Sequence, residues 1–199
     1  MMIILKSVKC IFADIMYFFS EASVKALIDA DVNRNLKWDA AKDRLKGKIM
    51  RLNYLLLKKI EFRNIFYLRV KRQRHLSAFC KVFLPGIDTI EFGSGEIGGG
   101  LLISHYHSVI CPGKTGANFR VGPGVVIDRD RDSYPTFGNN IYVASNSTVT
   151  GNVYIGDNVI IGAGSVVTEN LSGNGVYVGN PAKFLKHIDD NKDLLNEIM

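Results

Sequence analysis

The sequence has few of the residues that would cross-link a fold or hold a metal. Among 199 residues there are three cysteines, Cys10, Cys80 and Cys111, and they are widely separated. This spacing fits neither a disulfide framework nor a paired metal-binding motif, so we expect reduced thiols in a cytoplasmic protein. Histidine is also scarce, with four residues, which leaves few candidates for a general base.

Long uncharged apolar runs are absent as well. The first 19 residues are largely apolar, but Lys6, Lys9 and Asp14 interrupt them. No stretch reaches the roughly 18 residues that a membrane-spanning helix needs, and no small-residue cleavage site follows. We therefore expect neither secretion nor a transmembrane anchor, whereas an interfacial amphipathic helix is compatible with this composition.

Acidic residues are rare between positions 42 and 74. This segment has twelve Lys or Arg against Asp43 and Glu61, a local excess of +10 in a chain of net charge +6. Apolar residues recur there at helical spacing, which predicts a basic amphipathic helix or helix pair. The segment could be the solvated face of a helical cap or contact anionic lipid at the membrane, and we expect no nucleic acid because no such motif is present. Upstream, Asp29-Ala30-Asp31 suggests a loop and Trp38 a packing anchor.

The second half of the chain has a six-residue repeat. Eleven of twelve successive positions are apolar, a ten-residue step separates the sixth from the seventh, and a small residue usually follows each. A period of six is typical of a parallel β-helix, in which short strands meet at tight corners, and not of a helix or an exposed strand. The repeat positions are Ile97, Ile103, Val109, Thr115, Val121, Ile127, Phe137, Val143, Val149, Ile155, Ile161 and Val167.

Three segments carry a family resemblance. They are Ile97-Gly-Gly-Gly-Leu-Leu-Ile-Ser-His105, the doubled repeat from Val143 to Val167, and Val178-Gly-Asn-Pro-Ala-Lys183. Together they resemble hexapeptide-repeat acyltransferases of the serine acetyltransferase-like and polysaccharide O-acetyltransferase group, over about the last 100 residues. The resemblance implies a left-handed parallel β-helix, a homotrimer with active sites between subunits, and acetyl transfer from acetyl-CoA without a metal.

We expect three parts in the chain. Residues 1–85 form a basic helical region, residues 86–185 a left-handed β-helix acyltransferase domain, and residues 186–199 a helical tail.

The resemblance assigns His105 as the catalytic base, because it fills the histidine of the family's Ile-x-His motif. An attacking hydroxyl must lose its proton as the new bond forms, and imidazole has a suitable pKa for accepting it. The repeat register points His105 outward at a corner. His107, four residues past Ile103, falls where partly inward residues recur, so we expect it to pack or to support the acceptor site.

The chain departs from true serine acetyltransferases at two positions. Ser104 precedes the base where they have aspartate, and Tyr134 precedes Pro135 where they have histidine. Their second carboxylate would fall on Ile90 without a gap. The candidates to orient His105 are Glu91, which lies one residue away, followed by Asp88 and Glu96.

Residues equivalent to His105 in later coils are small, which suggests a groove for the coenzyme along one edge. Side chains of this size permit close approach of a pantetheine arm to the backbone, although tight corners require them too. Lys183 lies beyond the far end, where it could meet the coenzyme's phosphates. The expected coenzyme contacts are Ala144, Ser145, Gly162, Ala163, Gly164 and Lys183.

The ten-residue step inserts a charged segment, Asp128 to Pro135, that cannot be packed inside a coil. In the family, a loop at this point reaches the active site, so we assign it acceptor selection; a solvated loop is the alternative. The expected acceptor contacts are His107, Asp130, Arg131, Asp132 and Tyr134.

The resulting functional prediction is a saccharide O-acetyltransferase for surface or capsular polysaccharide, cytoplasmic and in contact with the inner membrane surface through residues 42–74. Serine O-acetyltransfer is the enzymatic alternative, and a non-enzymatic trimeric scaffold is the alternative of another class. A metalloenzyme on this coil would need three converging histidines, and the repeats contain two. An acyl-enzyme on Cys111 is not expected, because a thiol is only partly ionised at neutral pH.

Overall fold

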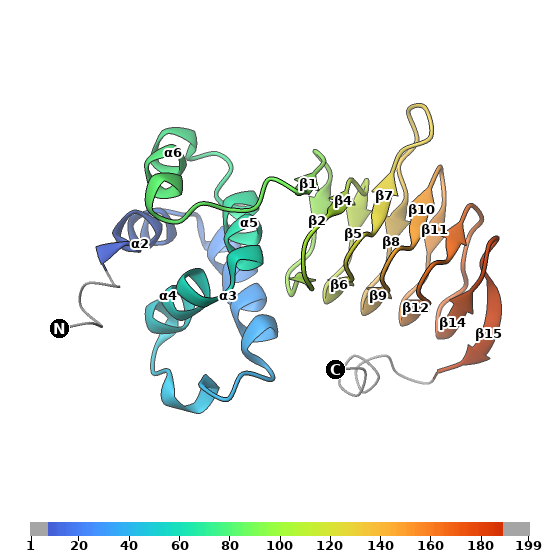
Figure 1. The fold of residues 1–199 in the computed structure, drawn as a ribbon, viewed down its shortest axis with the longest axis horizontal. Coiled ribbons are helices and arrows are strands. Elements are labelled where there is room, and N and C mark those ends of the chain that lie inside the picture. Colours follow the sequence, from blue (N-terminus) through green and yellow to red (C-terminus); the bar gives the residue numbers. More distant parts are fainter. Residues whose placement is uncertain (1–7, 189–199) are drawn as a thin grey trace. The chain divides into compact units, whose positions relative to one another are not determined.

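The computed structural model describes residues 8–188, which divide into two compact units between Asp88 and Thr89. The sequence placed this boundary between residues 85 and 86. One unit is built of helices and the other of short strands (Figure 1). Most of the expected C-terminal tail, residues 189–199, lies outside the described residues.

The first unit is helical, as the sequence predicted. None of the helices among residues 8–88 is long and apolar enough to cross a bilayer. Its elements are α2 (Ile11–Phe18), α3 (Ala22–Leu36), the short 3₁₀ helix η1 (Lys42–Arg44), α4 (Lys48–Lys58), α5 (Ile60–Arg69) and α6 (Arg74–Phe83).

The basic segment forms the helix pair α4 and α5. Most apolar side chains of the two helices pack into the core of the unit, although Ile49 and Met50 at the start of α4 are 39% and 51% exposed. Most basic residues of the segment are exposed. Most of the segment's apolar surface therefore packs within the unit. This favours the interpretation as the solvated face of a helical cap over that of a helix at the membrane interface. The buried residues are Leu52, Leu55 and Leu56 on α4, and Phe62, Ile65 and Phe66 on α5.

A buried ion pair joins α3 to α5. Arg69 Nε lies 2.7 Å from Asp31 Oδ2, and Arg69 Nη2 lies 3.1 Å from Asp31 Oδ1. Both side chains are almost fully buried, at 4% and 1% exposure for Arg69 and Asp31. The loop expected at Asp29–Asp31 is therefore wrong: these residues lie within α3, and burial with a cation explains the acid. Trp38 is half exposed and does not anchor the core.

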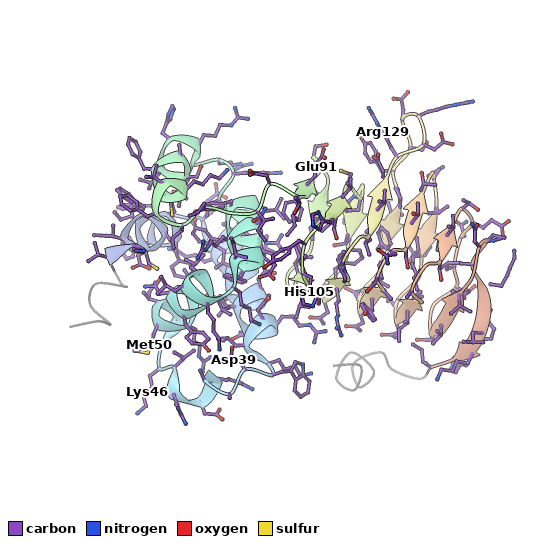
Figure 2. All side chains as sticks on the ribbon, in the orientation of Figure 1. Asp39, Lys46, Met50, Glu91, His105 and Arg129 are labelled. Atoms are coloured by element: carbon purple, nitrogen blue, oxygen red, sulfur yellow. The ribbon has the colours of Figure 1, made fainter. Side chains whose placement is uncertain are left out.

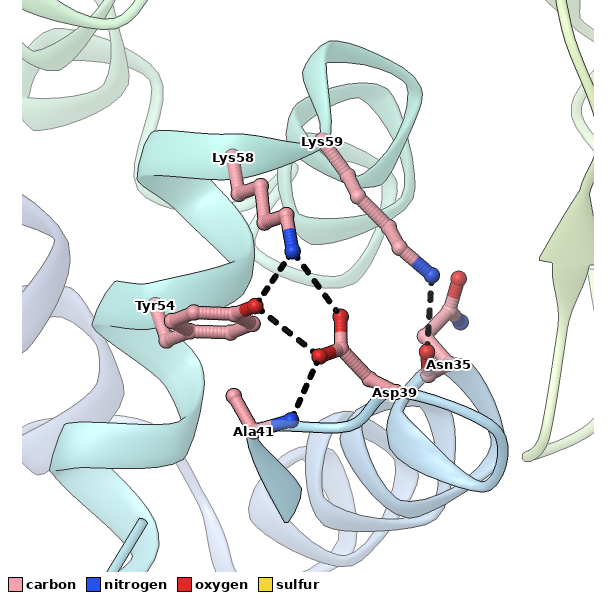
Figure 3. Close-up of polar contacts among 6 residues, drawn as sticks. All are labelled: Asn35, Asp39, Ala41, Tyr54, Lys58 and Lys59. Carbon is pink, nitrogen blue, oxygen red and sulfur yellow. Dashed lines mark hydrogen bonds and ion pairs between the residues drawn. The ribbon is translucent and has the colours of Figure 1, made fainter. Parts of the chain in front are cut away.

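Asp39 closes the turn after α3 and is the centre of a polar cluster (Figure 3). Its Oδ1 accepts hydrogen bonds from the Ala41 amide and the Tyr54 hydroxyl, both at 2.9 Å. The Lys58 ammonium lies 3.6 Å from Oδ2. Burial raises the pKa of Asp39, but the hydrogen bonds and the charges of Lys58 and Lys59 outweigh it and lower the pKa below its ordinary value.

This cluster predicts a pH-dependent contribution to stability. A carboxylate with a lowered pKa stabilises the folded state above its unfolded pKa of about 3.9, and this contribution disappears as the pH falls through the folded pKa. We expect Asp39→Asn to lower the free energy of unfolding by about 1–2 kcal/mol at pH 7. Urea unfolding of both proteins should show that difference shrinking below about pH 4; a difference independent of pH would contradict this account.

The second unit is a left-handed parallel β-helix, which confirms the predicted fold class. Fourteen short parallel strands form three flat sheets that wrap around one core, and β15 pairs antiparallel with β14 (Figure 1). The strand orders are β1-β4-β7-β10-β13 in sheet A, β11-β8-β5-β2 in sheet B, and β15-β14-β12-β9-β6-β3 in sheet C. The strands are β1 (Ile90–Phe92), β2 (Glu96–Ile97), β3 (Leu102–Ile103), β4 (Ser108–Ile110), β5 (Lys114–Thr115), β6 (Phe119–Val121), β7 (Val126–Asp128), β8 (Thr136–Phe137), β9 (Ile141–Val143), β10 (Thr148–Thr150), β11 (Tyr154–Ile155), β12 (Val159–Ile161), β13 (Val166–Val167), β14 (Gly175–Val178) and β15 (Lys183–His187).

The repeat positions fill the core with one exception. Eleven of the twelve are buried, including Thr115, but Val109 is only half-buried and Ile110 takes its place in the core. Ile110 pairs with Ile127 of the next coil. One extra residue therefore lies in the turn between β3 and β4. Lys186 and His187, expected in the tail, belong to β15.

One corner of the β-helix contains a ladder of asparagines. Asn118, Asn140, Asn158 and Asn174 all have a left-handed backbone, with φ between 56° and 59°. Each Nδ2 donates to the Oδ1 of the next asparagine at 2.8–2.9 Å. Asparagine tolerates this conformation better than most residues, so the ladder both turns and links successive coils.

Candidate active site

The candidate site follows the edge where the sheet C strands turn into sheet A. Ile103, Val121, Val143 and Ile161 pair in register from coil to coil. Two residues beyond each of them stand His105, Pro123, Ser145 and Ala163, as the sequence predicted. The amides of Asn146 and Gly164 donate to the carbonyls of Pro123 and Ser145 at 2.8 and 2.9 Å, which holds these turns on top of one another.

The fold itself requires small residues along this edge, and the same residues leave room for a ligand. A Cβ on Gly122 would lie 2.8 Å from the Ser145 amide nitrogen, so glycine is needed for the close stacking of these turns. Two buried serines behind the edge also hold it. Ser147 Oγ donates to the Gly162 carbonyl at 2.8 Å, and Ser165 Oγ accepts from the Gly179 amide at 3.1 Å. The edge is therefore a rigid strip with Ser145, Gly162, Ala163 and Gly164 at its surface, whereas Ala144, expected to contact the coenzyme, is buried beneath it.

His105 and His107 lie in the turn that contains the extra residue. Both are exposed, and both have a left-handed backbone, with φ of 68° and 64°. The expectation that His107 is partly inward is wrong, because the insertion moves Ser108 into that place. Ser108 is 2% exposed, and its Oγ donates to the Gly122 carbonyl at 3.2 Å. The turn thus presents two imidazoles on the outside of the first complete coil.

Glu91 lies on the neighbouring strand and not against the base (Figure 2). It is exposed on sheet A beside Val109, and within residues 8–188 it forms no hydrogen bond with His105. The turn is tied to the start of β1 instead: the Ser108 amide donates to the Thr89 carbonyl at 3.0 Å, and the His107 amide to Thr89 Oγ1 at 3.4 Å. The orienting role of Glu91 stays a prediction.

The other two carboxylate candidates lie on other elements. Asp88 is the last residue of the helical unit, and Glu96 lies on β2 in sheet B, a different face from the sheet A strand that follows His105. Their roles stay predictions as well.

The charged loop projects from another edge of the prism (Figure 2). It leaves β7 of sheet A and returns to β8 of sheet B, and Asp130 and Ser133 pair across it at 3.1 Å. Arg129 stacks over the Tyr134 ring at 6.0 Å, and Arg131 has φ of 55°. Since His105 lies at the edge between sheets C and A, one chain does not bring the expected acceptor contacts Asp130, Arg131, Asp132 and Tyr134 to the base.

The far end of the edge is closed by residues 179–182. The Val166 amide donates to the Gly179 carbonyl at 3.0 Å, and the Ala182 amide donates to the Val166 carbonyl at 2.8 Å. Lys183 follows directly and is exposed, with its Nζ 3.6 Å from Glu169 Oε2. A cation is thus present at this end, in a surface ion pair of small energetic weight.

Cys111 is poorly suited to act as a nucleophile. It is buried, and burial, together with the negative charges of Asp128 and Glu91, raises the pKa of its thiol. A raised pKa lowers the thiolate fraction at neutral pH, so direct transfer is favoured over an acyl-enzyme. Among the described residues, no group of three or more His, Cys, Asp or Glu could hold a metal ion.

Comparison with known sequences gives two kinds of match. The model of the family "bacterial transferase hexapeptide (six repeats)" matches residues 134–169. Residues 134–169 therefore carry the hexapeptide repeats of this family. A serine acetyltransferase of Buchnera aphidicola subsp. Schizaphis graminum is 24% identical over 155 residues, covering 68% of this chain and 56% of that protein. Galactoside O-acetyltransferase of Escherichia coli K12 is 42% identical over 59 residues, 29% of each chain.

Solved structures resemble this chain over a greater length. Neisseria gonorrhoeae serine acetyltransferase in complex with serine has a TM-score of 0.65 at 23% identity, covering 84% of this chain and 71% of that one. A serine acetyltransferase in complex with CoA has a TM-score of 0.62 at 18% identity, covering 85% and 72%. At these identities the likeness establishes a shared fold. The chain spans little more than half of its first curated relative, the Buchnera enzyme.

Proposed function

We propose that this protein transfers an acetyl group from acetyl-CoA to a hydroxyl of a small polar acceptor. The observation that carries the proposal is the edge itself, where exposed His105 stands at one end of a rigid strip of small residues. Relatives named as acetyltransferases, and a similar fold determined with CoA, support the donor.

Serine is the acceptor with the broader support. The match to a serine acetyltransferase covers 68% of the chain and so extends beyond the repeats, whereas the galactoside O-acetyltransferase match covers 59 residues. This reverses the order of preference that the sequence suggested. A saccharide hydroxyl stays the second candidate, because Ser104 and Tyr134 replace residues that the serine enzymes have beside the base and in the loop.

In the proposed mechanism, both substrates are bound together. His105 accepts the proton of the acceptor hydroxyl as its oxygen attacks the thioester carbonyl. The tetrahedral intermediate then collapses by breaking the carbon–sulfur bond, and the coenzyme thiolate leaves and takes up a proton. We further propose a homotrimer, in which residues 129–134 of a neighbouring copy supply acceptor contacts that one chain cannot bring to its own base.

The test is thiol release from acetyl-CoA by the purified full-length chain with serine and with a panel of glycosides and nucleotide sugars. Acceptor-dependent release with serine alone would establish the proposal as stated, and release with a sugar alone would promote the second candidate. No release with any acceptor, together with no binding of CoA, would overturn it in favour of a non-enzymatic scaffold.

A further inference from the structure

Helices α2 and α6 of the first unit, which lie side by side in Figure 1, both carry exposed apolar side chains. The two helices pack together, and the Phe12 ring stacks on Phe79 and Phe83 with centroids 6.2 and 5.9 Å apart. Phe18 and Phe79, one on each helix, are 70% and 62% exposed. The surface, called the α2–α6 surface below, consists of Val8, Ile11, Ile15, Phe18, Phe19, Phe79, Val82 and Phe83.

The exposure is not a consequence of poor folding, because each helix buries its opposite side. Ala13, Met16 and Tyr17 of α2 and Cys80 of α6 are buried. The exposed residues of α2 recur at intervals of three and four, which places them on one stripe of the helix. Monomeric soluble proteins seldom leave a large contiguous apolar surface uncovered, so this one is expected to have a partner.

Charge indicates the kind of partner. The first unit, residues 1–88, has 18 Lys or Arg against eight Asp or Glu, a net charge of +10. Lys25 Nζ lies 5.5 Å above the Phe18 ring, Lys9 is exposed just before α2, and Arg74 and Lys81 are exposed on α6. Two acidic side chains on or beside these helices have partners. Glu21 forms an ion pair with Arg72 at 3.3 Å, and partly buried Asp14 accepts a hydrogen bond from Asn53.

We propose that the α2–α6 surface binds a bilayer that contains anionic lipid. Phenylalanine and aliphatic side chains enter the boundary between headgroups and acyl chains, and the surrounding cations attract the negative headgroups. A second copy of this chain is the alternative occupant that the experiment must separate from the bilayer. The contact differs from the one expected at residues 42–74, where most apolar side chains of α4 and α5 are buried within the unit.

The experiment is sedimentation of the full-length chain with vesicles of phosphatidylcholine alone or mixed with one-third phosphatidylglycerol. We expect binding to the mixed vesicles, weakened by salt, and at least about tenfold weaker binding to phosphatidylcholine alone. Phe18→Ser and Phe79→Ser should each weaken binding by about tenfold. Leu185→Ser, a similarly exposed apolar position on β15, should leave it unchanged.

Two further measurements keep the outcome unambiguous. Lys9→Glu combined with Lys81→Glu leaves the apolar residues in place and should also weaken binding to mixed vesicles, by tenfold or more. Circular dichroism checks that each variant is folded. No sedimentation with mixed vesicles, or equal binding by the Phe18→Ser and Phe79→Ser variants, would overturn the proposal. Loss of self-association in these variants without any vesicle binding would overturn it in favour of a second copy.

Discussion

Replacement of His105 by alanine should lower kcat by roughly 10² to 10⁴ while the protein stays folded. The imidazole is the proposed acceptor of the hydroxyl proton, and without it the attack on the thioester must proceed by a weaker base. The side chain is exposed, so the free energy of unfolding should change little. The measurement is initial-rate thiol release at saturating acetyl-CoA and acceptor.

A second substitution controls for the backbone at this position. His105 has φ of 68°, a conformation that asparagine adopts more readily than alanine. His105→Asn should therefore retain the turn and lose the same activity, which separates chemistry from strain. His107→Ala should act mainly on the acceptor KM. Full activity in both His105 variants, or a loss in kcat confined to His107→Ala, would refute the assignment of the base.

Replacement of Asp31 by alanine should lower the free energy of unfolding by about 3–5 kcal/mol. The substitution leaves the Arg69 guanidinium buried without the carboxylate that it contacts at 2.7 and 3.1 Å. The readout is urea unfolding followed by far-ultraviolet circular dichroism at 222 nm, where the helical unit dominates the signal. This is the largest stability change we expect from a single side chain in that unit.

The matched control is the double variant Asp31→Leu, Arg69→Met. Removal of both charges replaces the pair by apolar side chains of similar size, which is often neutral or stabilising. The double variant should therefore recover most of the stability lost in Asp31→Ala. If it is no more stable than the single variant, the ion pair is not what holds α3 against α5.

The β-helix was predictable because its core repeats at a fixed period. Each repeat position stacks on its equivalent in the next coil, so the sequence shows the packing directly. The one error in register has a local cause: Val109 and Ile110 are both apolar, and either fits the pattern. The structure shows that Ile110 enters the core, which lengthens the His105 turn by one residue and exposes His107.

The helical unit was less predictable because its contacts are not periodic. Asp29-Ala30-Asp31 reads as a loop when only local composition is considered, and Arg69, the partner that buries Asp31, lies 38 residues away. Likewise, the sequence does not show that the exposed residues Phe18 and Phe79 lie on two helices that pack against each other. The separation of the charged loop from His105 also depends on which edge each turn occupies, and a linear repeat does not specify edges.

We expect acetyl-CoA to bind along the edge that begins at His105 and ends at Lys183. The most direct test is a calorimetric titration of the folded full-length chain with CoA. Saturable binding of one coenzyme for each chain is the expected result. The absence of any binding by protein shown to be folded would contradict this expectation.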